Sequence, residues 1–89
     1  MHSTESQNLL VPDIRAFVLT NFLFGQDGDA FKDDDSFLAK GIIDSTGVLE
    51  LVGFLEKHYD IHIENDELVP ANLDSVNRAA NFVRRKRRD

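Results

Sequence analysis

One short run of alternating apolar residues limits the folds open to this chain. Ile61 and Ile63 flank His62 in the pattern of a β-strand, but the sequence offers no second strand candidate to pair with them. A sheet is therefore not expected, and residues 61–63 are predicted to form an extended connector. What remains is an all-α fold, which the spacing of the other apolar residues also favours.

Three longer segments carry apolar residues at helical spacing. The first begins at Pro12, which suits a first helical turn, and stops at Gly25. The second opens around Asp44 and Ser45, and the third follows Asp74, which we expect to cap it. The inward-facing residues of the three predicted helices are Ile14, Phe17, Val18 and Phe22; Val48, Leu51, Val52, Leu55 and Tyr59; and Val76, Ala79, Ala80 and Val83.

The segments between these helices predict one further element and one long loop. Residues 65–68 can form a short helical turn before Pro70, and residues 25–41 form a connection that needs anchors, for which Phe31, Phe37 and Leu38 are the candidates. A chain of 89 residues forms one core. We therefore predict a four-helix bundle of three main helices and one short helix, with a long loop between the first two.

Composition sets the expected ends of the domain and its surroundings. Residues 1–8 read as a disordered N-terminal tail, residues 9–84 as the folded domain and residues 85–89 as a basic C-terminal extension. The chain has no cysteine, which excludes disulfides and thiolate catalysis. Its longest apolar segment is about half the ~20 residues that a membrane span needs. We expect a cytoplasmic monomer without stable membrane association.

Charge is distributed unevenly along the chain. The net charge is −6, although five of the ten basic residues are clustered from Arg84 to Arg88. An acidic body favours basic protein partners over nucleic acid. The cluster itself is predicted to interact with the dipole at the end of the last helix, and an anionic partner is the alternative.

Asp44 and Ser45 form the strongest candidate for a chemical site. They precede a helix, where free backbone N–H groups and the helix dipole favour an anionic group such as a phosphate. Ser45 has no nucleophile-elbow motif, and the histidines, His2, His58 and His62, lie in a tail or beyond the far end of the helix. We therefore expect no catalytic residue: Ser45 would be a helix cap or the substrate of another enzyme.

The residues around Ser45 resemble a known family. Gly41-Ile42-Ile43-Asp44-Ser45-Thr46-Gly47-Val48-Leu49-Glu50-Leu51-Val52 is similar to the phosphopantetheine attachment segment of acyl carrier proteins, and residues 36–38, 59–61, 66–68 and 74–76 follow the family's order. The resemblance spans residues 11–83. It implies a non-catalytic carrier with an acyl-carrier-like fold. Ser45 would hold 4'-phosphopantetheine, donated from coenzyme A by a phosphopantetheinyl transferase, and Asp44 would help position the metal during that transfer.

The chain also departs from carriers of bulk fatty acid synthesis. Thr46, Gly47, Gly53 and Lys57 stand where those carriers have apolar or acidic residues. We therefore expect a specialised acyl carrier, loaded by an activating ligase or an acyltransferase. The alternative is an aminoacyl carrier, because residues 41–47 also resemble D-alanyl carrier proteins. The expected partner-binding residues are Thr46, Leu49, Glu50, Gly53 and Glu56.

Two other patterns suggest metal sites but lack the full signatures. The acidic run from Asp27 to Asp35 does not place glycine and glutamate where a calcium-binding EF-hand loop needs them. His58 and His62 have no third ligand at zinc spacing. We predict no metal site, a solvated acidic loop and two surface histidines.

Overall fold

The computed structural model describes residues 10–24 and 31–87 and is all-helical over those residues. Its helices are α2 (Leu10–Asn21), α3 (Gly47–Tyr59), α4 (Pro70–Leu73) and α5 (Val76–Arg87), with a 3-10 turn, η2, at Asn65–Glu67. The predicted all-α bundle is confirmed. No helix in the described part of the chain is both long and apolar enough to cross a bilayer.

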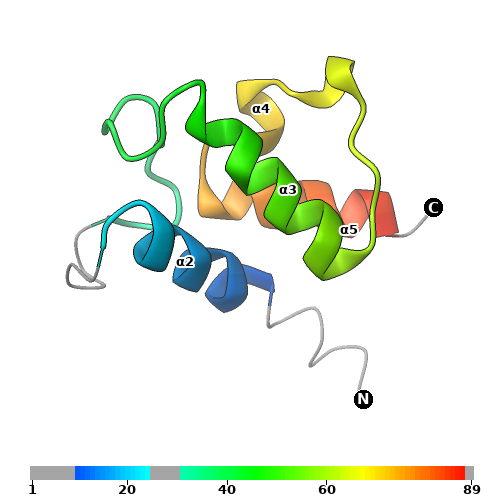
Figure 1. Cartoon of the computed structure of the whole chain (residues 1–89), viewed down its shortest axis with the longest axis horizontal. Helices are drawn as coiled ribbons and strands as arrows, with labels where there is room; N and C mark the ends of the chain where they lie inside the picture. Colours follow the sequence, from blue (N-terminus) through cyan, green and yellow to red (C-terminus); the bar gives the residue numbers. More distant parts are fainter. Residues whose placement is uncertain (1–9, 25–30, 88–89) are drawn as a thin grey trace.

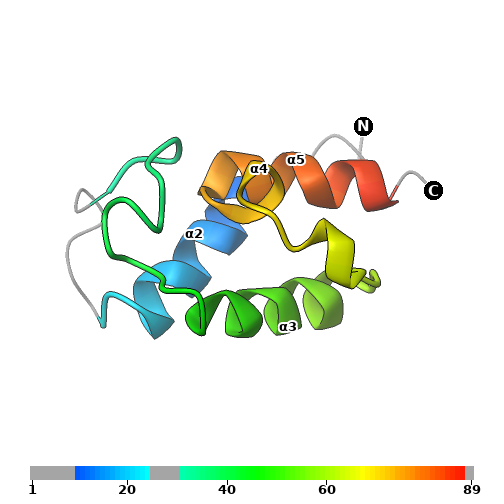
Figure 2. The ribbon, with the colours of Figure 1, turned by 90° about the horizontal axis from the view of Figure 1, so that it is seen from above.

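Helix α5 is the element on which the others pack. It contacts α2, α3 and α4, whereas α3 and α4 share no extensive contact with each other. Figure 1 shows α3 crossing in front of α5, and Figure 2 shows α3 on one side of the molecule with α4 and α5 on the other. The residues of α5 that face this core are Val76, Ala79, Ala80, Phe82 and Val83.

Helix α2 is slightly displaced from its predicted bounds. It begins at Leu10, which is buried, and ends at Asn21, whose side-chain amide donates to the Phe17 carbonyl. Pro12 is the third helical residue, where a missing N–H costs no hydrogen bond within the helix. The predicted stop, Gly25, and the predicted tail, residues 1–8, lie outside the described residues.

The loop before α3 is anchored by two of its three expected residues. Phe31 and Phe37 are buried, as predicted, but Leu38 is 47% exposed, so its prediction was wrong. Polar contacts provide further anchors: Asp33 pairs with Arg15 of α2 at 2.8 Å, and Asp34 accepts a hydrogen bond from Asn77 of α5. These two acids hold the loop and are therefore more than solvated charges.

The predicted short helix is present as a 3-10 turn, and a further helical turn that was not predicted follows it. The 3-10 turn η2 occupies residues 65–67, close to the prediction, and α4 is an additional single turn. Val69 separates them because a residue before proline avoids helical geometry, and its φ of −127° and ψ of 153° are extended. Pro70 then begins α4, a position that suits proline. Residues 61–63 form the extended connector that their pattern indicates.

Helix α5 is capped by a different residue from the one expected. The Ser75 hydroxyl accepts the Arg78 backbone N–H at 3.0 Å, so the prediction of Asp74 as the cap was wrong. The Asp74 carboxylate instead accepts hydrogen bonds from the Ser36 hydroxyl and, at 3.0 Å, from the Leu38 backbone N–H. Helix α5 continues to Arg87, so residues 85–87 of the expected extension belong to the helix.

Candidate functional site

Ser45 lies in an exposed turn directly before α3. The Asp44 carboxylate accepts the Gly47 backbone N–H at 2.7 Å, and the Asp44 carbonyl accepts the Val48 N–H at 3.1 Å. Asp44 therefore caps the helix. Within the described residues, the Ser45 hydroxyl has no hydrogen-bond partner. The hydroxyl is free for chemistry, and the start of α3 lies beside it.

Gly47 allows the ends of α2 and α3 to approach closely. A Cβ atom at this position would lie 2.9 Å from Cε1 of Phe22 and 3.1 Å from Cγ2 of Ile43. Both separations are shorter than ordinary van der Waals contact, so a larger residue would push the turn that carries Ser45 away from α2. The departure from the acyl-carrier pattern at Gly47 thus has a packing reason in this chain.

The described histidines lie far from Ser45 or are already paired. His58 is thirteen residues further along the chain, about 20 Å at the helical rise, and its Nε2 lies 3.5 Å from an Asp13 carboxylate oxygen. His62 lies between Glu56 and Glu64, at 3.7 and 3.2 Å. Among residues 10–24 and 31–87, no group of three side chains could hold a metal ion. None of the described histidines forms a hydrogen bond or ion pair with Ser45.

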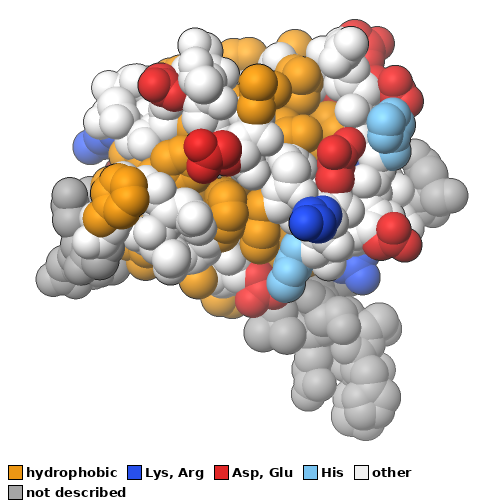
Figure 3. Space-filling view, viewed as in Figure 1, with side chains coloured by type: hydrophobic (Ala, Val, Ile, Leu, Met, Phe, Trp, Pro, Cys, Tyr) orange, Lys and Arg blue, Asp and Glu red, His pale blue; other side chains and the backbone are white. Residues whose placement is uncertain are grey.

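An apolar groove of about 210 Å³ begins beside Ser45. It runs between the start of α3 and the segment that carries α4. Figure 3 shows hydrophobic side chains exposed on this face of the molecule. Leu38, Leu49 and Val69, which are 47%, 61% and 40% exposed, all line it. The other lining residues besides Ser45 are Val48, Leu68, Pro70, Leu73 and Asp74. The groove can shelter an apolar group attached to Ser45.

A second, shallower groove follows the junction of α2 and α3. Gly53 lines it, and a Cβ at this position would meet no atom within 4 Å other than its chain neighbours and the backbone of its own helix. Phe54 stacks on Phe17 at 4.2 Å between ring centroids and on His58 at 4.9 Å. Glu50 and Lys57 also line this groove. The missing side chain at Gly53 therefore leaves an aromatic surface accessible.

The predicted partner-binding residues do not form one uniform surface. Thr46, Leu49 and Glu50 are exposed on the first turns of α3, near Ser45. Glu56, in contrast, is half-buried and accepts the Ile63 backbone N–H at 2.9 Å. Glu56 therefore holds the connector to α3, and sequence spacing alone could not distinguish this role from that of Glu50.

The pKa values of Tyr59 and Glu67 differ from their ordinary values. Burial raises the pKa of Tyr59 to about 12, with a contribution from Asp13, and its hydroxyl has no hydrogen-bond partner among the described residues. The hydrogen bond from the Glu64 backbone and the contact with Lys86 lower the pKa of Glu67. Both groups lie away from Ser45 in sequence and are absent from the lining of its groove.

Comparison of the chain with protein-family models, curated proteins and solved structures gave no match. Its function must therefore be inferred from the sequence around Ser45 and from the geometry of the site. The two features that bear on it are the free hydroxyl and the adjoining apolar groove.

Proposed function

We propose that this chain is a non-catalytic acyl carrier whose Ser45 is modified with 4'-phosphopantetheine. The observation that carries the proposal is an exposed, unbonded serine hydroxyl next to a helix-capping aspartate and at the mouth of an apolar groove. The resemblance of residues 41–52 to the attachment segment of acyl carrier proteins points to the same chemistry. The thiol of the arm would carry the cargo as a thioester.

The residues present fit such a group. A phosphate on Ser45 would lie at the positive end of the thirteen-residue helix α3. In the attachment reaction the Ser45 oxygen would bond to phosphorus as the nucleotide part of coenzyme A leaves. The serine proton would pass to a base on the transferase, and Asp44, which is exposed, would help position the metal during the transfer.

The groove favours an acyl cargo over an aminoacyl cargo. Its walls are mostly aliphatic, and its one carboxylate, that of Asp74, already accepts hydrogen bonds from Ser36 and Leu38. An ammonium group would have to compete with Ser36 and Leu38 for this carboxylate, whereas an acyl chain can contact the aliphatic walls directly. The D-alanyl-like alternative rests on the pattern of residues 41–47.

The proposed partners are a phosphopantetheinyl transferase and an acyl-activating ligase or acyltransferase. Asp44 and Glu50 are exposed near Ser45, together with Thr46 and Leu49. Basic partner surfaces would contact these acids, and Leu49 would add an apolar contact. We propose that the carrier works as a cytoplasmic monomer that meets its partners transiently.

Intact-mass measurement tests the proposal. The protein is incubated with coenzyme A, magnesium and a phosphopantetheinyl transferase, and we expect the gain of one phosphopantetheine. Ser45→Ala should gain none, whereas Thr20→Ala, which removes an exposed hydroxyl from α2, should be loaded like the parent. An arm on Ser45→Ala, or no arm on the parent, would refute the site.

Candidate acyl- and aminoacyl-activating ligases are then offered to the arm-bearing protein. Thioester formation is followed by mass. Loading by the acyl ligase alone supports the acyl carrier, and loading by the amino-acid ligase alone supports the alternative. Efficient cycling through the enzymes of ordinary fatty-acid elongation would contradict a specialised role.

A further inference from the structure

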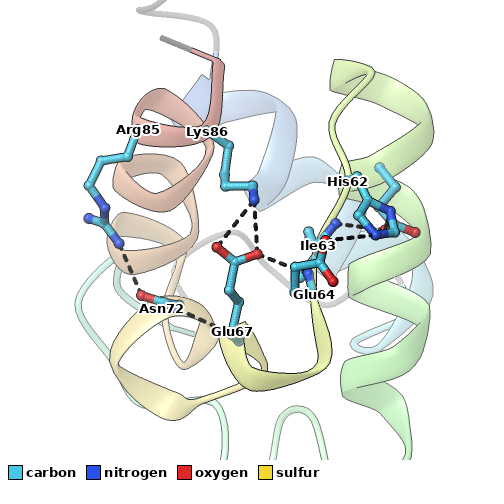
Figure 4. Close-up of polar contacts among 8 residues, drawn as sticks. His62, Ile63, Glu64, Glu67, Asn72, Arg85 and Lys86 are labelled. Atoms are coloured by element: carbon cyan, nitrogen blue, oxygen red, sulfur yellow. Dashed lines mark hydrogen bonds and ion pairs between the residues drawn. The ribbon is translucent and has the colours of Figure 1, made fainter. Parts of the chain in front are cut away.

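One wall of the Ser45 groove is attached to α5 by cationic side chains. The wall is the segment of residues 65–73, which contains η2 and α4 and contributes Leu68, Val69, Pro70 and Leu73 to the groove. Figure 4 shows Lys86 and Arg85 reaching from α5 to this segment. The opposite wall belongs to α3, and α3 shares no extensive contact with α4.

Three side chains of α5 bind the wall at three points along its length. Lys86 Nζ lies 2.9 and 3.2 Å from the two carboxylate oxygens of Glu67. Arg85 donates to the Asn72 side-chain oxygen at 3.0 Å, and Arg78 donates to the Pro70 carbonyl at 3.2 Å. We call Arg78, Arg85 and Lys86 the α5 clamp.

Hydrogen bonds within the wall link the residues that the clamp contacts. The Asn72 amide donates to the Glu67 carbonyl at 3.0 Å, so Arg85 and Lys86 hold the two ends of one bonded unit. Glu67 accepts the Glu64 backbone N–H at 2.9 Å, which fixes the entry to η2. The wall can therefore shift as a unit when the clamp is weakened.

Apolar packing holds the wall at two positions, Leu73 and Leu68, of which Leu68 is only partly buried against the core. Leu73 is its single buried residue, and η2 has none. Leu68 is half-buried, while Val69 and Pro70 are exposed. Because few side chains of the wall are buried in the core, the polar contacts from α5 add to its positioning.

We propose that the α5 clamp sets the width of the groove beside Ser45 and thereby selects the length of acyl chain that the groove shelters. This inference rests on the proposed carrier function. It gives the basic end of α5 a role within the molecule: Lys86 and Arg85 are directed to the groove wall. Releasing the clamp lets the wall shift relative to α3, which changes the length of acyl chain that the groove shelters.

The first test uses the protein without an arm. Amide hydrogen exchange is measured at Val69, Leu73 and Asp74, whose N–H groups bond within the wall. We expect Lys86→Met and Glu67→Gln each to speed this exchange by about two- to fivefold, the range of a partly exposed ion pair. Exchange in the middle of α2 should stay unchanged.

Arg84→Met is the matched control. It removes the same charge from the same helix, but Arg84 donates to Asn81 within α5 rather than to the wall. The wall should exchange at the parent rate in this variant. If Arg84→Met had the same effect as Lys86→Met, or if neither Lys86→Met nor Glu67→Gln had any, the clamp would be refuted.

The second test measures cargo directly. Straight-chain acyl groups of increasing length are placed on the Ser45 arm, and cleavage of each thioester by hydroxylamine is timed. We expect the protection of the longer chains to change by about two- to fivefold between the parent and Lys86→Met. Arg84→Met should keep the parent profile.

The outcomes separate the two proposals. If Ser45 takes no arm, the carrier function fails, and with it the role of the clamp in cargo selection. If the arm attaches but Lys86→Met and the parent protect the same chain lengths, the carrier function stands and the clamp proposal is overturned.

Discussion

At the scale of single residues, the two glycines of α3 have opposite surroundings. Gly47 faces Phe22 and Ile43 at less than ordinary contact distance, whereas Gly53 faces open space. Both lie in the same helix, where alanine has a higher helix propensity than glycine. That gain stabilises the fold only where there is room for the added methyl group. The local packing should therefore decide the sign of each substitution.

We predict that Gly47→Ala destabilises the fold and Gly53→Ala stabilises it. Overpacking against Phe22 should lower the free energy of unfolding by about 1–2 kcal/mol, and the gain at Gly53 should be about 1 kcal/mol. Urea denaturation of the two variants measures both values. Equal stabilisation by the two alanines would show that the contact with Phe22 does not restrict position 47.

At the scale of elements, η2 depends on a charged Glu67. This carboxylate faces Lys86 on α5 and Glu64 and His62 on the connector. The Glu64 backbone N–H and Lys86 stabilise the charged form and hold the pKa of Glu67 below its ordinary value of 4.5. The stabilisation is therefore present above the unfolded pKa and is lost as the pH falls through the folded pKa.

We predict a pH-dependent difference between the parent and Glu67→Gln. The parent should be more stable near neutrality, and the difference should shrink as the pH falls below 4.5, because the parent carboxylate then becomes neutral as well. Urea denaturation across the acid range measures it. A difference that stays constant with pH would mean that the charge of Glu67 does not contribute.

The elements also show what the sequence could and could not predict. The apolar stripes located α3 and α5, and Asp44-Ser45 was correctly placed before a helix. Helix α4 has only four residues, too few for any periodicity. Asp74 and Ser75 are both good caps, and only the fold shows that Asp74 is engaged by the loop.

The groove was harder to predict than any single element. Its walls come from three separate parts of the chain, at Leu38, at residues 45–49 and at residues 68–74. Leu38 was expected in the core because it is apolar, yet it lies at the rim of the groove. A surface built from distant segments has no signal in local spacing, so the candidate hydroxyl was predictable and its apolar surroundings were not.

At the scale of the whole molecule, opposite charges occupy different elements. The chain carries a net charge of −6, and the last turn of α5 is basic. Asp44 and Glu50 are exposed at the start of α3, close to Ser45 in the sequence. Lys86 of α5, in contrast, is paired with Glu67. A basic partner should therefore be drawn toward the start of α3.

We predict that Glu50→Lys slows loading of Ser45 at low salt by about three- to tenfold, because it reverses the field that steers a basic partner. The free energy of unfolding should change little, since Glu50 is exposed and has no polar partner among the described residues. Asp66→Lys makes the same change of net charge on η2, away from the Ser45 turn, and should load at close to the parent rate. High salt should remove the difference. Equal slowing by both variants would mean that net charge governs the encounter and that partners do not recognise the exposed face of α3.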